Sequence, residues 1–267
     1  MKELSYYNLR KDDKVEISSE ICSLAETIWH IAPGSTLSNR ISELIASYYN
    51  QWRFVLDSYE KLFSLVQELN SKDSSSENVL SEFDIFWLKT EPEFKNYSYL
   101  LITSLKSLLD LFTCVVDVIQ NQQIRREHEF PDFFKYLGQP KKITLWIDEL
   151  SKYFQDIRVS EKWISKVKII RDRVIHRGYL LNSHRTKTAQ IDDLTIRTYK
   201  GSDFYSNREE FNVGELIDNF LINMPKIENS VSNILVQNVD YLKENGVTHA
   251  SYFRYYELVN EYGSKES

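Results

Sequence analysis

The feature that most constrains this chain is a repeat of apolar residues at three- and four-residue spacing from about Leu37 to Leu69. Such spacing places the side chains on one stripe of a helix and predicts a long amphipathic helix. The chain has only 7 glycines and 5 prolines in 267 residues, so we expect long helices elsewhere too. We therefore predict an all-α fold, an antiparallel helical bundle. The repeat consists of Ile41, Leu44, Ile45, Tyr48, Trp52, Val55, Tyr59, Leu62, Phe63 and Val66.

Similar patterns, with capping and breaking residues, predict the other elements. Ser160 is the expected N-cap of the helix that starts there, and Pro225 is expected to interrupt or kink the last helix. The alternating residues of 194–200 and 203–205, separated by Gly201-Ser202, predict a small hairpin. A first helix is expected to begin near Ser18 or Ser19. The further helices are predicted at Val79–Lys89, ending before Pro92, and at Tyr97–Glu127, Ile143–Ile157, Ser160–Arg177 and Val213–Leu242.

The polar tract 70–78 is the best linker candidate, because it breaks the apolar repeat with serine and charged residues. We expect an N-terminal helical extension over 1–90 and a helical bundle over 91–245. The bundle carries the hairpin near 193–206. Residues 246–267 form an aromatic tail that we expect to pack as structure.

Composition limits the compartment and the class of protein. The most apolar stretch, 99–119, contains Lys106, Asp110 and Asp117, which do not sit comfortably in lipid. The N-terminal residues lack the apolar core of a signal peptide, and two cysteines are too few for a disulfide framework. We expect a soluble, cytoplasmic protein without a membrane partner.

The segment 168–179 carries the most distinctive chemistry of the chain, because Arg171 and His176 lie five residues apart in an apolar helical pattern. A guanidinium can hold a phosphate through two oxygens, and an imidazole can move a proton near neutral pH. A second pair, Arg177 and His184, is separated by Gly178 and polar residues that indicate a helix stop and a loop. The first pair is therefore the preferred candidate site.

Helix geometry limits how these two side chains can meet. At about 100° per residue, Arg171 and His176 are about 140° apart around one straight helix. Either the helix ends near Gly178 and the histidine turns round, or a twofold dimer brings two copies of the motif together.

The charge around this segment differs from that of the whole chain, whose formal net charge is −6. Between Arg158 and Lys187 there are nine basic residues and two acidic ones. Two interpretations stay open: a solvated helix face with cations toward its C-terminus, which the helix dipole favours, or a basic groove that engages a few phosphates.

Arg171, Asp172, three further residues and His176, with apolar residues before the arginine and Arg177-Gly178 after the histidine, resemble the motif of the HEPN superfamily. The resemblance covers about 95–245, and only the motif is sharp. It implies a helical bundle that pairs as a homodimer to assemble one composite cleft. It also implies metal-independent RNA cleavage without a cofactor, in which the ribose 2′-hydroxyl attacks the neighbouring phosphorus.

The same resemblance assigns roles to residues of this chain. Arg171 would stabilise charge on the phosphoryl oxygens, His176 would transfer the proton, and Asp172 would orient the cluster. RNA-binding roles are expected for Lys168, Arg173 and Arg177. Tyr179 stands three residues after the histidine, and not two as in toxins that a partner nucleotidyltransferase modifies, so regulation by that route is not expected.

A setting in toxin-antitoxin pairs or antiviral defence, with an antitoxin or defence partner protein, is implied by family analogy alone. No metal site is predicted, because the histidines lack a second ligand at suitable spacing. The alternative function is a noncatalytic helical interaction module, in which the motif is buried or occluded.

Overall fold

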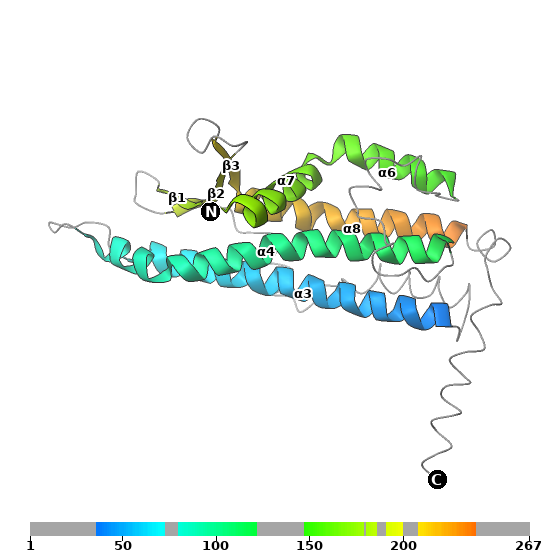
Figure 1. Ribbon diagram of the computed structural model, residues 1–267, viewed down its shortest axis with the longest axis horizontal. Helices are drawn as coiled ribbons and strands as arrows, with labels where there is room; N and C mark the ends of the chain where they lie inside the picture. The colour runs from blue at the N-terminus through cyan, green and yellow to red at the C-terminus, as the bar shows by residue number, and fades with distance from the viewer. Residues whose placement is uncertain are drawn as a thin grey trace, which may run out of the picture. The chain divides into compact units, whose positions relative to one another are not determined.

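The computed structural model describes residues 36–72, 80–121, 147–178, 180–185, 191–199 and 208–238. This part of the chain is mostly helical with one small antiparallel sheet, which confirms the all-α expectation in its coarse form (Figure 1). The elements in chain order are α3 (Thr36–Asn70), α4 (Glu82–Asn121), α6 (Asp148–Ser160), α7 (Lys162–Arg177), β1 (Leu180–Arg185), β2 (Ile191–Tyr199), β3 (Arg208–Asn212) and α8 (Val213–Gln237).

Several predictions lie outside the described residues. They are the helix near Ser18 or Ser19, the helix ends at 122–127, 143–146 and 239–242, most of the linker tract, the hairpin turn with its strand at 203–205, and the aromatic tail.

The described residues form two compact units. The sheet unit comprises 50–72, 80–108, 162–178, 180–185, 191–199 and 208–222, and the helical unit comprises 36–49, 109–121, 147–161 and 223–238. The sheet unit contains α7 and all three strands, and each of the three long helices contributes one segment to each unit.

Helix α3 follows the predicted apolar repeat closely. Trp52 and Val55 are buried in the sheet unit, as are Leu62 and Val66 further along the same stripe. The spacing of these residues is the reason that the segment is helical, because one continuous stripe can then face the core.

Helix α4 corrects the prediction that one helix ends before Pro92 and another begins near Tyr97. It is a single helix with Pro92 inside it. A proline inside a helix removes the hydrogen bond to the carbonyl of Leu88. Both residues are exposed, so water can satisfy this carbonyl and the helix continues. The predicted burial of the apolar stripe is confirmed at Leu101, Leu105 and Leu109. The prediction is wrong at Leu100, which is exposed.

Helix α7 confirms its predicted core face, because Trp163, Val167, Ile170 and Val174 are all buried. The predicted N-cap is wrong. Ser160 is the last residue of α6, and the backbone N–H of Glu161 donates to the carbonyl of Ile157 to close that helix. Helix α7 then begins at Lys162.

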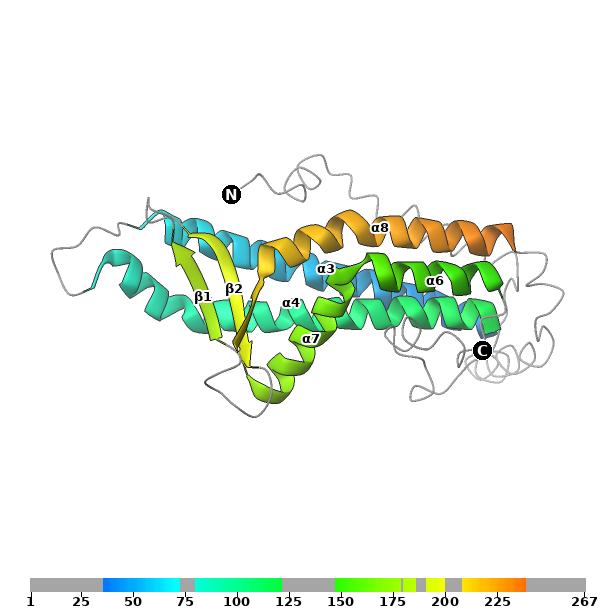
Figure 2. The same ribbon diagram turned by 90° about the horizontal axis from the view of Figure 1, so that it is seen from above.

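The small antiparallel sheet has three strands in the order β1-β2-β3 (Figure 2). On β2, Leu194, Ile196 and Thr198 lie on one face of the strand and are buried, and Thr195 on the other face is buried as well. The expected loop at Asn182-Ser183 is wrong, because both residues lie on β1 and pair with β2. Strand β3 completes the sheet and leads directly into α8.

Helix α8 continues through Pro225 to Gln237, so the helix is not interrupted at this proline, and the kink expected there stays a prediction. Its start is capped by Asn212, whose side-chain oxygen accepts a hydrogen bond from the backbone N–H of Glu215 at 2.8 Å. This is the usual N-cap geometry, which satisfies one of the free amides of the first turn.

The helical unit buries polar groups among its apolar side chains. Tyr48 packs against Phe112 and donates a hydrogen bond from its hydroxyl to Glu228, and both partners of this bond are buried. On α6, burial raises the pKa of Tyr153, and a hydrogen bond to the side chain of Ser230 opposes this shift. These bonds join α3 and α6 to the second half of α8.

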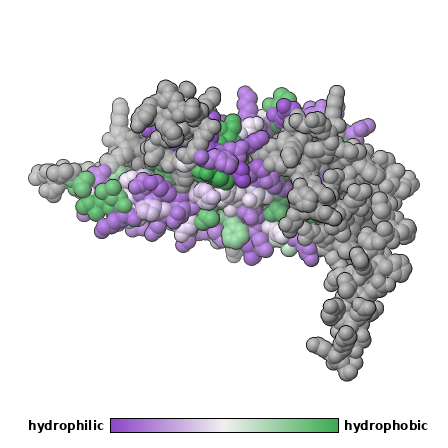
Figure 3. All heavy atoms as spheres, in the orientation of Figure 1, coloured by the Kyte–Doolittle hydropathy of each residue, from purple (hydrophilic) through white to green (hydrophobic). Residues whose placement is uncertain are grey.

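By length and composition alone, residues Glu82–Asp117 could cross a membrane, but 61% of their most apolar window is buried inside the protein. That burial is typical of the core helix of a soluble protein. On the face drawn in Figure 3, hydrophilic side chains lie between separate apolar patches.

Candidate functional site

The candidate site lies on α7, which the core of the sheet unit holds from one side. Trp163 meets Phe220 of α8 edge to face, with 5.7 Å between the ring centroids, and Phe220 also packs against Trp52 at 4.7 Å. Trp163 is one residue of the buried stripe of α7, which therefore faces the core of the sheet unit. The opposite side of the helix is therefore the side that can meet another molecule.

We call that opposite side the motif face, which consists of Ile169, Asp172, Ile175 and His176. Asp172 and His176 are four residues apart, hence about 40° apart around the helix and one turn apart along it. His176 is exposed and Asp172 is half-exposed. Ile169 and Ile175 are each 38% exposed, so the polar pair lies between two apolar side chains.

Arg171 is joined to the motif face by Asp172. Its Nη1 donates to Oδ1 of Asp172 at 3.0 Å, and both side chains are partly exposed. Asp172 lies between Arg171 and His176 around the helix, about 100° from the first and 40° from the second. The ion pair therefore draws the guanidinium round the helix toward the side that bears the histidine.

Helix α7 ends after the motif, so Arg171 and His176 both lie on it. The helix ends at Arg177, and Gly178 follows with a φ of +71°, the left-handed conformation that suits glycine after a helix. The predicted helix stop at Gly178 is confirmed. Because the helix does not end between Arg171 and His176, the histidine does not turn round through a break in it.

Arg173 has a set of internal partners. Its Nη1 donates to Oε2 of Glu209 on β3 at 2.7 Å and to the hydroxyl of Thr198 on β2 at 3.2 Å. The guanidinium also lies over the ring of Phe211, 5.7 Å from its centroid. The side chain is only 13% exposed. These contacts connect α7 to two strands, and the phosphate-binding role expected from sequence stays a prediction.

The other predicted RNA-binding residues lie at different places on the helix, Lys168 near its middle and Arg177 at its last position. Lys168 is exposed, whereas the side chain of Arg177 is outside the described residues. Arg177 and His184, the other pair considered in the sequence, do not lie on one helix. Arg177 is the last residue of α7, and His184 lies on β1.

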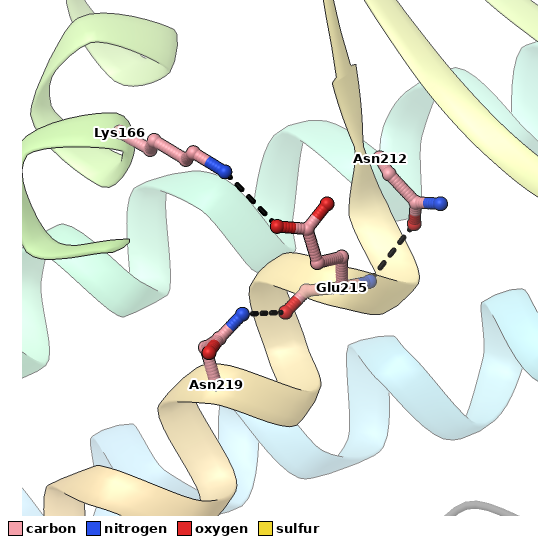
Figure 4. A network of polar contacts seen from close by, with 4 residues as sticks. All are labelled: Lys166, Asn212, Glu215 and Asn219. Atoms are coloured by element: carbon pink, nitrogen blue, oxygen red, sulfur yellow. Dashed lines mark hydrogen bonds and ion pairs between the residues drawn. The ribbon is translucent and has the colours of Figure 1, made fainter. Parts of the chain in front are cut away.

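A second connection of α7 was not foreseen from the sequence. Lys166 forms an ion pair with Glu215 of α8, with 3.0 Å between Nζ and Oε1, and Asn212 and Asn219 hold the backbone of Glu215 from both sides (Figure 4). The sequence Asn212-x-x-Glu215 before an apolar run is a capping-box pattern. It marks the start of α8, which was predicted correctly at Val213, but it does not reveal the distant lysine.

Metal ligands are not gathered at this site. Within the described ranges, no group of three or more His, Cys, Asp or Glu side chains is placed to hold a metal ion.

Comparison of the chain with models of protein families, with curated proteins and with solved structures found no significant match. The resemblance to the HEPN superfamily therefore depends on the motif of α7.

Proposed function

We propose that this protein is a metal-independent endoribonuclease of the HEPN type, which acts as a homodimer with the motif faces of two copies forming one cleft. The observation that supports it best is the arrangement on α7: Asp172 and His176 share an exposed face, and Asp172 holds Arg171 toward that face at 3.0 Å. A phosphate-binding cation and a proton-transfer group are thus offered to the same side of the helix.

The dimer in this proposal is supported by the residues of the motif face. One copy presents one imidazole, whereas cleavage needs a base for the 2′-hydroxyl and an acid for the leaving oxygen. A twofold contact presents the same surface from both copies, and Ile169 and Ile175 supply apolar area around it. Two copies of His176 then serve the two proton transfers.

The reaction follows from these groups. One imidazole removes the proton of the 2′-hydroxyl, whose oxygen bonds to the phosphorus. The bond from phosphorus to the 5′-oxygen breaks, and the second imidazole protonates that oxygen. Arg171 stabilises the charge on the phosphoryl oxygens during the step. The products are a 2′,3′-cyclic phosphate and a 5′-hydroxyl, and DNA resists because it lacks the 2′-hydroxyl.

The test is cleavage of a labelled single-stranded RNA with a chelator present. His176→Ala is expected to lower the rate by about a thousandfold, the usual scale for loss of a general acid or base. Ser165→Ala, at an exposed position on the same side of α7, is the matched control and is expected to cut normally. Undiminished cutting by a folded His176→Ala variant would overturn the proposal.

The composite cleft needs its own measurement, because an active monomer would contradict it. Light scattering at high salt, together with activity measured across the same concentrations, is expected to show a dimer whose dissociation abolishes cleavage. Mixing Arg171→Ala with His176→Ala protein should change the activity if the two copies share one cleft.

A noncatalytic interaction module is the second candidate. The neutralised cations of α7 favour it, whereas the exposed His176 does not match the buried or occluded motif that it predicts. Arg171 is paired with Asp172, and Arg173 with Glu209. Under this candidate, wild-type and His176→Ala proteins both leave RNA intact. For the ribonuclease and for the noncatalytic module alike, family analogy suggests the same setting. We propose a cytoplasmic role in toxin-antitoxin pairs or antiviral defence, with an antitoxin or other partner protein.

A further inference from the structure

Two basic residues on one side of α7 are each joined to an acidic residue near the start of α8. Lys166 and Arg173 are seven residues apart, hence only about 20° apart around the helix and two turns apart along it. Lys166 pairs with Glu215 at 3.0 Å, and Arg173 pairs with Glu209 at 2.7 Å. The two glutamates lie on either side of the junction between β3 and α8.

We call these two ion pairs the latch of α7. Its two points differ in strength. The Arg173 guanidinium is largely buried, reaches two strands and lies over an aromatic ring, and such charge-assisted bonds hold geometry well. The Lys166 pair is exposed at the surface and contributes little to stability by itself. It adds a second point of attachment, which resists rotation of the helix about its axis.

The latch bears on the motif face through that rotation. Side-chain ends lie about 5–6 Å from a helix axis, so a turn of 20° would move them by about 2 Å. Misplacement of reacting groups by about 1 Å can lower a rate about a hundredfold. The position of Asp172 and His176 therefore depends on how firmly α7 is held in rotation.

We propose that Lys166 and Arg173 are positioning residues, which fix the rotation of α7 so that the motif face presents Arg171 and His176 to the substrate. This inference deepens the proposed ribonuclease function and depends on it for its kinetic test. Neither residue touches the reacting atoms in this scheme. Arg173 thereby acquires a role that differs from the phosphate contact expected from sequence.

The first variant is Arg173→Lys, which keeps the charge but loses the planar fork. At saturating RNA we expect kcat to fall about tenfold or more while KM changes less than about twofold, because positioning and not charge is lost. The matched control is Arg197→Lys, which alters another arginine-glutamate pair of the same sheet, between Arg197 and Glu210. It is expected to leave both constants unchanged.

The second variant guards against a folding defect, because the Lys166 pair is exposed. Lys166→Glu is expected to lower kcat about fivefold with an unchanged unfolding midpoint. Adding Glu215→Lys restores the pair with reversed charges and should restore kcat to within about twofold. Unchanged kcat in both Arg173→Lys and Lys166→Glu proteins would overturn the inference, and so would a loss that the reversed pair does not rescue.

A structural readout separates this inference from the proposed function. Nitroxide labels are placed at Ser165 on α7 and at Glu93 on α4, with Cys22 and Cys114 replaced by serine and the protein diluted with unlabelled chain. The distance distribution between the labels is expected to broaden or shift with Arg173→Gln. If wild-type protein cuts no RNA, the ribonuclease proposal fails, yet a shifted distribution still supports the latch, whereas an unchanged one overturns it.

Discussion

The sheet unit and the helical unit use carboxyl groups in different ways. In the helical unit, Asp117 and Glu228 are 0% and 1% exposed, and Glu228 accepts a hydrogen bond from Tyr48 inside the core. In the sheet unit, Glu209 and Glu215 are partly exposed and hold α7 from outside, Glu209 through the largely buried Arg173 and Glu215 through the exposed Lys166. Removing one partner of a buried charged pair is costly, whereas a surface pair can change with little loss of stability.

This difference indicates which carboxyl groups can orient the motif face and which only stabilise the fold. The interior of the sheet unit around α7 is an aromatic cluster, and the ion pairs at its edge are free to set the orientation of the motif face. The buried carboxyl group of Glu228 in the helical unit has no such freedom, because it depends on the hydrogen bond that Tyr48 donates to it inside the core. Three substitutions test this comparison by their effects on stability.

The largest effect is expected from Phe220→Ala, which removes the centre of the aromatic cluster. Phe220 is fully buried between Trp52 and Trp163. The lost contacts and the cavity should lower the free energy of unfolding by about 4 kcal/mol, measured by urea titration with tryptophan fluorescence. Phe54→Ala on α3 is the matched control, because Phe54 is 61% exposed, and it should change the value by less than about 0.5 kcal/mol. Equal losses would show that the cluster is not the core of the sheet unit.

A smaller effect is expected from Tyr48→Phe in the helical unit. The substitution removes the hydroxyl that donates to Glu228 and leaves the buried carboxyl group with one donor fewer. Hydrogen bonds to charged groups contribute about 2 kcal/mol, so the free energy of unfolding should fall by about that amount at neutral pH. Tyr49→Phe, at the exposed neighbouring position, should have almost no effect. If the two variants unfold alike, the buried bond does not stabilise the helical unit.

Much of the fold could be predicted from the sequence, because it depends on local periodicity. The repeat on α3 and the stripe of Trp163, Val167 and Ile170 on α7 point to helices with a buried side, and the structure has both. The errors occurred where exposure to water or strand pairing overrides a local signal. Pro92 breaks no helix because its place is exposed, and Asn182 lies on a strand because β2 pairs with it.

The candidate site could be predicted only in part, for a related reason. Arg171, Asp172 and His176 are neighbours along the chain, so their spacing alone places two of them on one face of a helix. The partner of Arg173 is Glu209, 36 residues further on. Such a contact depends on how the sheet packs against α7, and the helical pattern of 160–177 holds no information on it.

The smallest effect is expected from Asp218→Asn on α8. Asp218 tests the comparison most closely, because it is a carboxylate of the sheet unit and yet is partly buried. Among the described residues, its Oδ1 is buried without a hydrogen-bond partner, and burial raises its pKa above the ordinary value of 3.8. Just above pH 3.8 the folded protein therefore holds the proton more tightly than the unfolded chain. The contribution of Asp218 to the free energy of unfolding falls as the pH rises through that window.

At neutral pH the carboxylate is charged in both states, and the folded state bears the cost of partial desolvation. Asp218→Asn should remove that cost and flatten the pH dependence. Because much of the group is in contact with water, the gain at pH 7 should be about 0.5 kcal/mol or less. Urea titrations from pH 4 to pH 7 measure it, with Asp57→Asn at an exposed position on α3 as the matched control. A loss of stability at pH 7 with Asp218→Asn would show that this carboxylate is bonded as Glu228 of the helical unit is, and the contrast between the units would then fail at this residue.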